Sequence, residues 1–239
     1  MTYHFPSRLL PRFLILILAL TVSVMGQEGE QETEKKKRDH TQLRLICVSS
    51  LKPDQEVILS TRDDKGEWLE LGKTGLRSSF ISDWLPAKPG QLHLALPGGD
   101  EPVSICRFNY PAGARRVLVV LIADPVKNIY RAGVFDPEKM NFAKGSVLAI
   151  NFSPRSGMVV LGGKKILLKS GAQSVVKPSL EANGMYRMLV AYEDEARKPV
   201  PCFDRYVQGN PDSRDLLFLL PDHTLGIKVF SLPIFGSFD

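Results

Sequence analysis

Histidine beside a serine or a carboxylate is the first combination in this chain that could do chemistry. Of the three histidines after residue 26, His40 lies in a charged stretch, His93 on the polar side of an alternating run, and His223 in a turn beside Asp222. A Ser-His-Asp hydrolase needs its nucleophile next to the base, commonly on the strained turn Gly-x-Ser-x-Gly. That signature is absent. We therefore expect no catalytic residue and no enzyme activity; the alternative is a hydrolase whose site is assembled from distant loops.

Two groups of neighbouring carboxylates, Asp63-Asp64 and Glu193-Asp194-Glu195, could serve glycoside hydrolysis or bind calcium. Neither has the Asp-x-Asp-x-Asp-Gly spacing of a calcium loop, and nothing nearby supplies an aromatic platform for a sugar. Residues Gly162-Gly163-Lys164-Lys165 lack the spacing of a phosphate-binding loop and indicate a turn. The sequence predicts solvated loop acids, no metal and no cofactor.

The cysteines Cys47, Cys106 and Cys202 lack the spacing of a zinc site. In an oxidising compartment they allow one disulfide and leave one free thiol. Cys47 shares the parity of the apolar Leu43 and Leu45, so we expect it to point into a core. A Cys47–Cys106 bridge is the expected pairing, and buried free thiols are the alternative.

Both tryptophans, Trp68 and Trp84, fall in the first half of the chain. They are the candidates for contact with a ligand, since an exposed ring on a sheet face can stack on a sugar. Packing in a core or on a sheet face is the alternative. A carbohydrate-binding module would carry such rings coplanar on one exposed sheet face.

The N-terminal segment has the pattern of a secretory signal peptide. Arg8 and Arg12 precede the apolar run 13–24, and small residues stand at positions 24 and 26. We expect a signal peptide over 1–26, and hence a secreted, periplasmic or cell-surface protein. The alternative is an uncleaved anchor, since the apolar window 9–25 approaches the length of a membrane span. Contact with a membrane is expected only through this segment.

Residues 27–41 are predicted to be a charged, disordered linker, because they combine alternating glutamates with Lys35-Lys36-Lys37-Arg38 and lack core residues. The signal segment removes two arginines and no acid from 31 basic and 26 acidic residues, which leaves a formal charge of +3. That balance is too even for a nucleic-acid-binding protein, so no nucleic acid is expected as a partner. A cluster of four lysines between residues 164 and 177 is typical of a solvated sheet face.

Short apolar runs separated by Gly, Pro, Asn or Asp turns predict strands throughout. The same order of features occurs in both halves of the chain. Ser49-Ser50 corresponds to Ser153-Pro154, Pro89-Gly90 to Asn183-Gly184, and the run 116–124 to 214–222. A repeat of this length has the size of a domain. We expect an all-β protein with two tandem β-sandwiches, of immunoglobulin-like or transthyretin-like type, over 42–136 and 143–233.

The second half resembles the small β-sandwich domains that occur in tandem in uncharacterised secreted bacterial proteins. The resemblance is carried by Ile150–Pro154, by Val159–Gly163, and by the strand entry Asn183–Tyr186. It implies a fold and an exported location, and no catalytic residues.

These observations favour a non-catalytic exported protein that binds, or has a structural role, through its sandwich loops and sheet edges. The expected partner is another envelope or extracellular protein, with a glycan as the second option. A carbohydrate-binding module is the main alternative to this function.

Overall fold

The computed structural model describes residues 41–98, 102–194, 196–222, 224 and 226–236. The predicted signal peptide, all but the last residue of the predicted linker, and the histidines His40 and His223 lie outside these ranges. Within them no helix is present, and hence none long and apolar enough to cross a membrane.

The described chain is all-β, as the sequence predicts, and contains sixteen strands. The first eight strands are β1 (Gln42–Ser49), β2 (Gln55–Arg62), β3 (Trp68–Leu76), β4 (Phe80–Pro86), β5 (Gly90–Leu96), β6 (Val103–Tyr110), β7 (Arg116–Asp124) and β8 (Ile129–Phe135). The other eight are β9 (Val147–Asn151), β10 (Gly157–Leu161), β11 (Lys164–Leu168), β12 (Gln173–Val176), β13 (Met185–Glu193), β14 (Pro199–Gln208), β15 (Arg214–Asp222) and β16 (Gly226–Ile234).

The strands form four sheets of four strands each, in two pairs. The first sheet pair consists of β4-β1-β7-β8 and β3-β2-β5-β6, and the second of β12-β9-β15-β16 and β11-β10-β13-β14. Adding eight to each strand number of the first pair gives the strand order of the second. In both pairs the first and seventh strands are parallel neighbours, whereas all other pairings are antiparallel.

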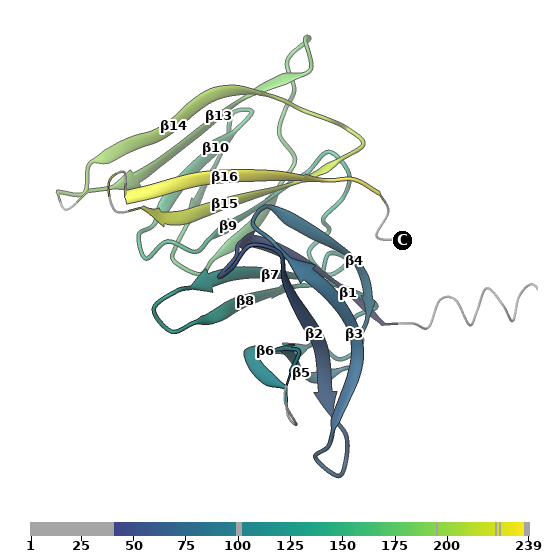
Figure 1. Ribbon diagram of the computed structural model, residues 1–239. Coiled ribbons are helices and arrows are strands. Elements are labelled where there is room, and N and C mark those ends of the chain that lie inside the picture. Colours follow the sequence, from purple (N-terminus) through teal and green to yellow (C-terminus); the bar gives the residue numbers. More distant parts are fainter. Residues whose placement is uncertain (1–40, 99–101, 195, 223, 225, 237–239) are drawn as a thin grey trace, which may run out of the picture.

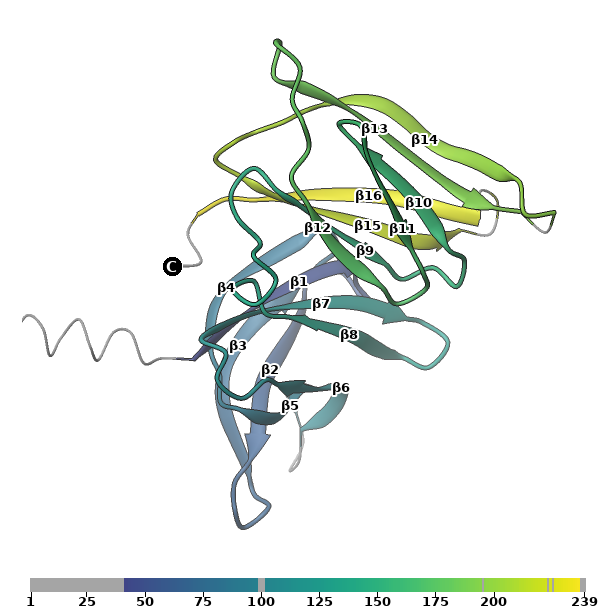
Figure 2. The ribbon, with the colours of Figure 1, turned by 180° about the vertical axis from the view of Figure 1, so that it is seen from behind.

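The four sheets are stacked as layers (Figures 1 and 2). The sheets that contain β1 and β9 face each other in the middle and are here called the inner sheets. The sheets that contain β2 and β10 are the outer sheets, at opposite ends of the stack. Each antiparallel outer sheet therefore keeps one face in solvent, while each inner sheet is covered on both faces.

Strand alternation divides the apolar residues of the inner sheets between two cores. On β7, Val119 and Leu121 point into the first sheet pair, while Leu118 and Val120 point toward the second. On β15, Leu217 and Leu219 pack inside the second pair, while Leu216 and Phe218 point the other way. This explains why both strands are almost continuously apolar, since a strand buried on both faces needs apolar side chains of either parity.

The layer between the inner sheets is a third hydrophobic cluster, here called the central core. Its buried members are Ile46, Val48, Leu118, Val120, Ile122, Phe135, Phe142, Leu148, Ile150, Leu216, Phe218 and Ile234. Phe218 stacks on Phe230 with ring centroids 6.0 Å apart, and Phe152 lies 6.3 Å from Phe218. Because this core draws buried residues from both sheet pairs, the two pairs pack against each other through a shared hydrophobic core.

The connection between the sheet pairs contains consecutive turns rather than a regular helix. Asp136 caps them, since its Oδ1 accepts hydrogen bonds from the backbone nitrogens of Glu138 and Lys139 at 3.1 Å. Phe142 then enters the central core. The guanidinium of Arg214 fixes this connection, because its Nε donates to the carbonyl oxygen of Phe142 at 2.7 Å.

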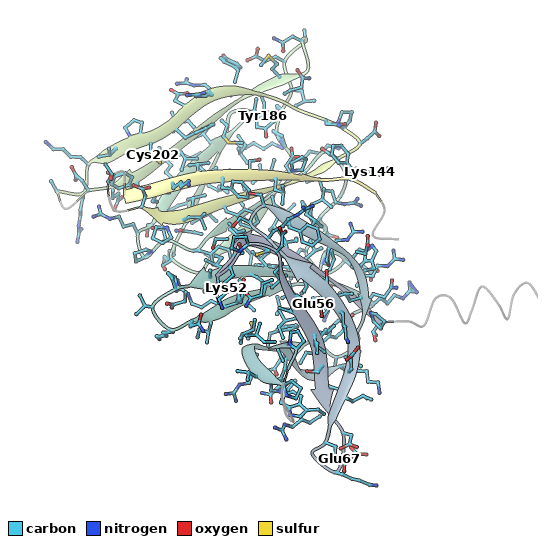
Figure 3. All side chains as sticks on the ribbon, in the orientation of Figure 1. Lys52, Glu56, Glu67, Lys144, Tyr186 and Cys202 are labelled. Atoms are coloured by element: carbon cyan, nitrogen blue, oxygen red, sulfur yellow. The ribbon has the colours of Figure 1, made fainter. Side chains whose placement is uncertain are left out.

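Two of the predicted hairpin turns illustrate the local chemistry. Asp63 Oδ1 accepts hydrogen bonds from the backbone nitrogens of Lys65 and Glu67, both at 2.9 Å, and so closes the β2–β3 hairpin. Glu67 lies in that hairpin at the far tip of the first sheet pair (Figure 3). In the β10–β11 hairpin Gly162 has φ = +54°, and a side chain there would meet the backbone of Ser179. Only glycine satisfies both conditions.

Candidate functional site

Trp68 lies on β3, an edge strand of the first outer sheet. The guanidinium of Arg62 lies over its ring at 4.5 Å from the centroid, and the ring of His93 meets it edge-on at 4.9 Å. Trp68 is partly buried, and its Nε1 has no hydrogen-bond partner among the described residues. The ring packs on side chains of its own sheet.

Trp84 lies on β4, in the first inner sheet, and packs against the central core. Arg44 and Arg116 place their guanidinium groups over its ring, at 4.6 Å and 5.3 Å from the centroid. Trp84 and Trp68 therefore lie on different sheets of the first pair, and each ring carries a stacked arginine. The structure does not bring the two predicted ligand-contacting rings onto one face.

His93 is 6% exposed on β5, and its Nδ1 lies 3.2 Å from Ser104 Oγ. Its pKa is lowered from the ordinary value, chiefly because burial disfavours the charged ring and further because Arg107 and Arg62 lie nearby. No carboxylate contributes to this shift. Neutral at pH 7, His93 packs under Trp68 and lies beside cations rather than acids.

Two of the loop acids, Asp63 and Asp194, cap turns by accepting hydrogen bonds from backbone nitrogens. Asp194 Oδ1 accepts a hydrogen bond from the backbone nitrogen of Lys198 at 2.8 Å, as Asp63 does in its own hairpin. Glu193 ends β13 and is exposed. No group of three or more His, Cys, Asp or Glu side chains suited to a metal ion occurs in the described part of the chain.

The three cysteines carry free thiols in the structure. Cys47 on β1 and Cys106 on β6 both belong to the core of the first sheet pair, whereas Cys202 lies on β14 in the second. Burial raises the pKa of Cys47 and of Cys106 to about 12, so neither is a reactive thiolate at neutral pH. Cys47 and Cys106 both affect the pKa of the Tyr130 hydroxyl, so the two thiols lie in the same region of that core.

The lysines of the second half are partly tied to the backbone. Lys164 Nζ donates to the carbonyl oxygen of Lys177 at 2.6 Å, which joins β11 to the segment after β12. Lys165 and Lys169 are exposed. Lys177 also lines a cavity.

This cavity lies in the second sheet pair, has a volume of about 70 Å³, and is here called the end pocket. Its walls come from the start of β13, the start of β15 and three connecting loops. The residues that define it are Lys144, Lys177, Leu180, Tyr186, Pro211 and Asp215. Lys144 and Tyr186 are both labelled in the upper sheet pair of Figure 3.

Tyr186 is the inner wall of the end pocket. Its side chain is 1% exposed and packs with Met188 and Val190 in the core of the second pair. Its hydroxyl is buried and has no hydrogen-bond partner in the described structure. A buried hydroxyl without a partner costs about 1–3 kcal/mol, which makes it the feature of this pocket that needs explaining.

Asp215 is the second polar group inside the pocket. It has the parity of Leu217 and Leu219 on β15, so its half-buried side chain points toward the interior of the second pair. The hydroxyl of Ser213 donates to its Oδ1 at 3.4 Å. Burial raises the pKa of Asp215, and the Ser213 hydrogen bond opposes that shift. Burial also raises the pKa of Tyr186 to about 12, with a further contribution from the charge of Asp215.

The corresponding end of the first sheet pair is closed by apolar side chains. Leu92, third in β5 from Gly90, corresponds to Tyr186, third from Gly184, and Val117 on β7 corresponds to Asp215 on β15. Leu92 and Val117 are fully buried. The pocket in the second pair therefore arises where two apolar residues are replaced by polar ones.

Tyr110 completes the closure of the first pair. It lies opposite Gly90 at the end of β6, and its hydroxyl lies 3.0–3.3 Å from three backbone carbonyl oxygens, those of Gln42, Ala114 and Arg115. At the corresponding place in the second pair Gly209 donates its backbone nitrogen to the carbonyl oxygen of Gly184. A glycine stands where the first pair has a tyrosine, and the side chain of Leu180, another residue of the pocket, packs against it.

One sequence signal could have indicated the pocket. Asp215 precedes the run of apolar residues on β15 at a position with core-facing parity, where a carboxylate is out of pattern. The alternation in β13 predicts that Tyr186 points inward. It does not predict that the hydroxyl of Tyr186 lacks a hydrogen-bond partner.

Comparison with known proteins assigns no family: no protein-family model matches the chain, and no curated protein matches it significantly.

Proposed function

We propose that the protein is a non-catalytic binding protein of the cell envelope or the extracellular space, and that the loops around the end pocket form its binding end. The exported location rests on the signal-peptide pattern of residues 1–26. The ligand is a polar group borne by another envelope or extracellular protein or by a glycan.

The observation that carries this proposal is the buried, unpartnered hydroxyl of Tyr186, a residue that lines the same cavity as Asp215. A hydroxyl that can both donate and accept, beside a carboxyl, is suited to orient a polar group. The apolar Leu180 and Pro211 supply contact area in the same pocket. The role assigned to the pocket is recognition, because no serine, cysteine or histidine is among the residues that line it.

The proposed fold type is the transthyretin-like one of the two sandwich types considered. In an immunoglobulin sandwich the first and second strands share a sheet. Here β1 pairs with β4 and β7, while β2 pairs with β3 and β5 in the other sheet. The same holds for β9 and β10, so the strand order favours the transthyretin-like arrangement in both pairs.

The proposal is tested by nuclear magnetic resonance on isotope-labelled mature protein, with a panel of small polar molecules of diverse charge. Binding at the pocket is expected to shift the backbone amides of Gly145, Lys177 and Gly209 while leaving those of β2 and β3 unchanged. A panel that shifts none of these amides contradicts the assignment of the pocket.

The non-catalytic part is tested separately with glycoside, ester and peptide substrates. No turnover is expected. Turnover that is lost in Glu193→Ala or Asp194→Ala would show that the loop acids serve an enzyme. Intact-mass measurement of the exported protein tests the location, since cleavage after Gly26 predicts an N-terminus at Gln27.

A further inference from the structure

The polar groups that line the end pocket differ in burial: an uncharged hydroxyl is innermost, a carboxylate lies next, and two ammonium groups lie at the surface. Tyr186 is its buried inner wall, Asp215 is half-buried, and Lys144 and Lys177 are exposed. This order restricts the chemistry of a ligand. The following inference rests on the proposed function of the pocket and names the group that it recognises.

The inner part of the pocket requires a hydrogen-bond donor. An ionised Asp215 offers only acceptor oxygens, and one of them already accepts from Ser213. The hydroxyl of Tyr186 can accept one hydrogen bond and donate another. An amino or hydroxyl group between them would donate to Asp215 and satisfy Tyr186, whereas a purely accepting group would leave the carboxylate without a donor.

The outer part of the pocket requires an anion. Lys144, just before β9, and Lys177, just after β12, contribute two ammonium groups, and Asp215 is the one carboxylate among the residues that line the cavity. A cation without a compensating negative charge would face these lysines as it entered. A carboxylate at the same place would pair with them.

We propose that the end pocket binds a small carboxylic acid group that carries an amino or hydroxyl group on the adjacent carbon. The donor lies inside between Asp215 and Tyr186, and the carboxylate lies outside between Lys144 and Lys177. The cavity volume of about 70 Å³ corresponds to a few heavy atoms, since one water molecule takes about 30 Å³ of liquid. Leu180 and Pro211 leave the wall apolar where a short side chain would lie.

The first sheet pair provides an internal control. Its corresponding end has Leu92 and Val117 instead of Tyr186 and Asp215, and the ring of Tyr110 closes it. The same acids are therefore expected to leave the amides around Tyr110 unchanged.

Four small probes separate the two halves of the inference: glycine, glycolate, acetate and methylamine. Glycine and glycolate have both the donor and the carboxylate, whereas acetate lacks the donor and methylamine lacks the anion. In titrations followed by amide shifts of the mature protein, at least one of the first two is expected to bind about tenfold or more tightly than either of the last two. Comparing glycine with glycolate then decides between an amino and a hydroxyl group.

Variants test the assigned residues. Tyr186→Phe removes only the hydroxyl, and the double variant Lys144→Gln/Lys177→Gln removes both cations; each is expected to weaken binding of the preferred acid about tenfold. Lys127→Gln, an exposed lysine in the turn between β7 and β8, is the matched control and is expected to bind normally. Unchanged amide spectra of β1 and β7 confirm that each variant is folded.

Affinities for glycine and for glycolate that are both no higher than the affinity for acetate, or unchanged binding by Tyr186→Phe, would overturn the inference. Shifts at Gly145, Lys177 and Gly209 with polar molecules outside this class, together with none from the four probes, would also overturn it while leaving the proposed function in place. No shift at these amides with any molecule contradicts both.

Discussion

The hydroxyl of Tyr110 lies 3.0 Å from the carbonyl oxygen of Arg115 and ties the end of β6 to the start of β7. Burial raises the pKa of Tyr110 to about 12, while the hydrogen bond to the Gln42 carbonyl opposes the shift. The group is therefore a neutral donor at neutral pH. At the corresponding end of the second pair, the hydroxyl of Tyr186 has no hydrogen-bond partner among the described residues.

Replacing these two tyrosines with phenylalanine is expected to have opposite effects. Tyr110→Phe leaves buried carbonyl oxygens without their donor and should lower the free energy of unfolding by about 1–3 kcal/mol. Tyr186→Phe removes a hydroxyl that has no partner and should leave stability unchanged or raise it slightly. Urea denaturation of both variants measures the difference. A destabilised Tyr186→Phe would reveal a hydrogen bond that the structure does not contain.

The central core predicts that the two sheet pairs unfold together. Phe218 is fully buried between the inner sheets, so Phe218→Ala should cost about 3–5 kcal/mol. Both the wild type and this variant should show a single calorimetric transition, because residues of both pairs share this core. Phe235→Ala, at a side chain that is 62% exposed, is the control and should change stability by less than about 0.5 kcal/mol. Two separated transitions in the wild type would contradict the shared interior.

Asp215 predicts a pH dependence of stability whose sign follows from its raised pKa. Since the folded state holds this proton more tightly than the unfolded state, stability falls as the pH rises from the ordinary aspartate pKa, about 3.9, through the raised value in the folded protein. Asp215→Asn should therefore stabilise the protein at pH 7, and the gain should vanish below about pH 4. Thermal unfolding of both proteins from pH 3 to pH 8 measures it. A gain that is independent of pH would assign the effect to packing rather than to charge.

The cysteines predict a specific oxidation product. Cys47 and Cys106 share one core on strands of facing sheets, while Cys202 lies in the other sheet pair. Oxidised protein should therefore contain a Cys47–Cys106 bridge and a free Cys202, which peptide mapping without reduction can establish. In reduced, folded protein the two buried thiols should resist alkylation, because their pKa values of about 12 leave them protonated. A bridge to Cys202 would contradict the arrangement of the cores.

The sequence predicts the strands well because their signals are local. Alternation in runs such as 90–96 and turn residues such as Asp63 and Gly162 depend on a few neighbouring residues, and the described residues form sixteen strands. The central core depends on contacts between distant segments. Continuous apolar runs in β7 and β15 are compatible with burial on both faces, but they do not tell which sheet covers the second face.

The candidate site is less predictable for a related reason. Trp68 and Trp84 are candidates for ligand contact because of their residue type. In the structure, however, arginines from other strands or from the far side of a turn lie over their rings. The end pocket, in contrast, is lined by residues of three loops and two strands that lie far apart in the sequence. A cavity of this kind is a property of the packed structure and has no sequence motif.

The parallel pairing of β1 with β7 has a consequence for the order in which each half of the chain folds during its synthesis. Gln42 pairs with Arg116, and in the second half Val147 pairs with Asp215. The first strand of each half can pair with the seventh only after most of that half has been synthesised. Until then, the backbone groups on that side of the first strand face water. Such long loop closures slow folding, so the parallel pairing in each half is expected to form late.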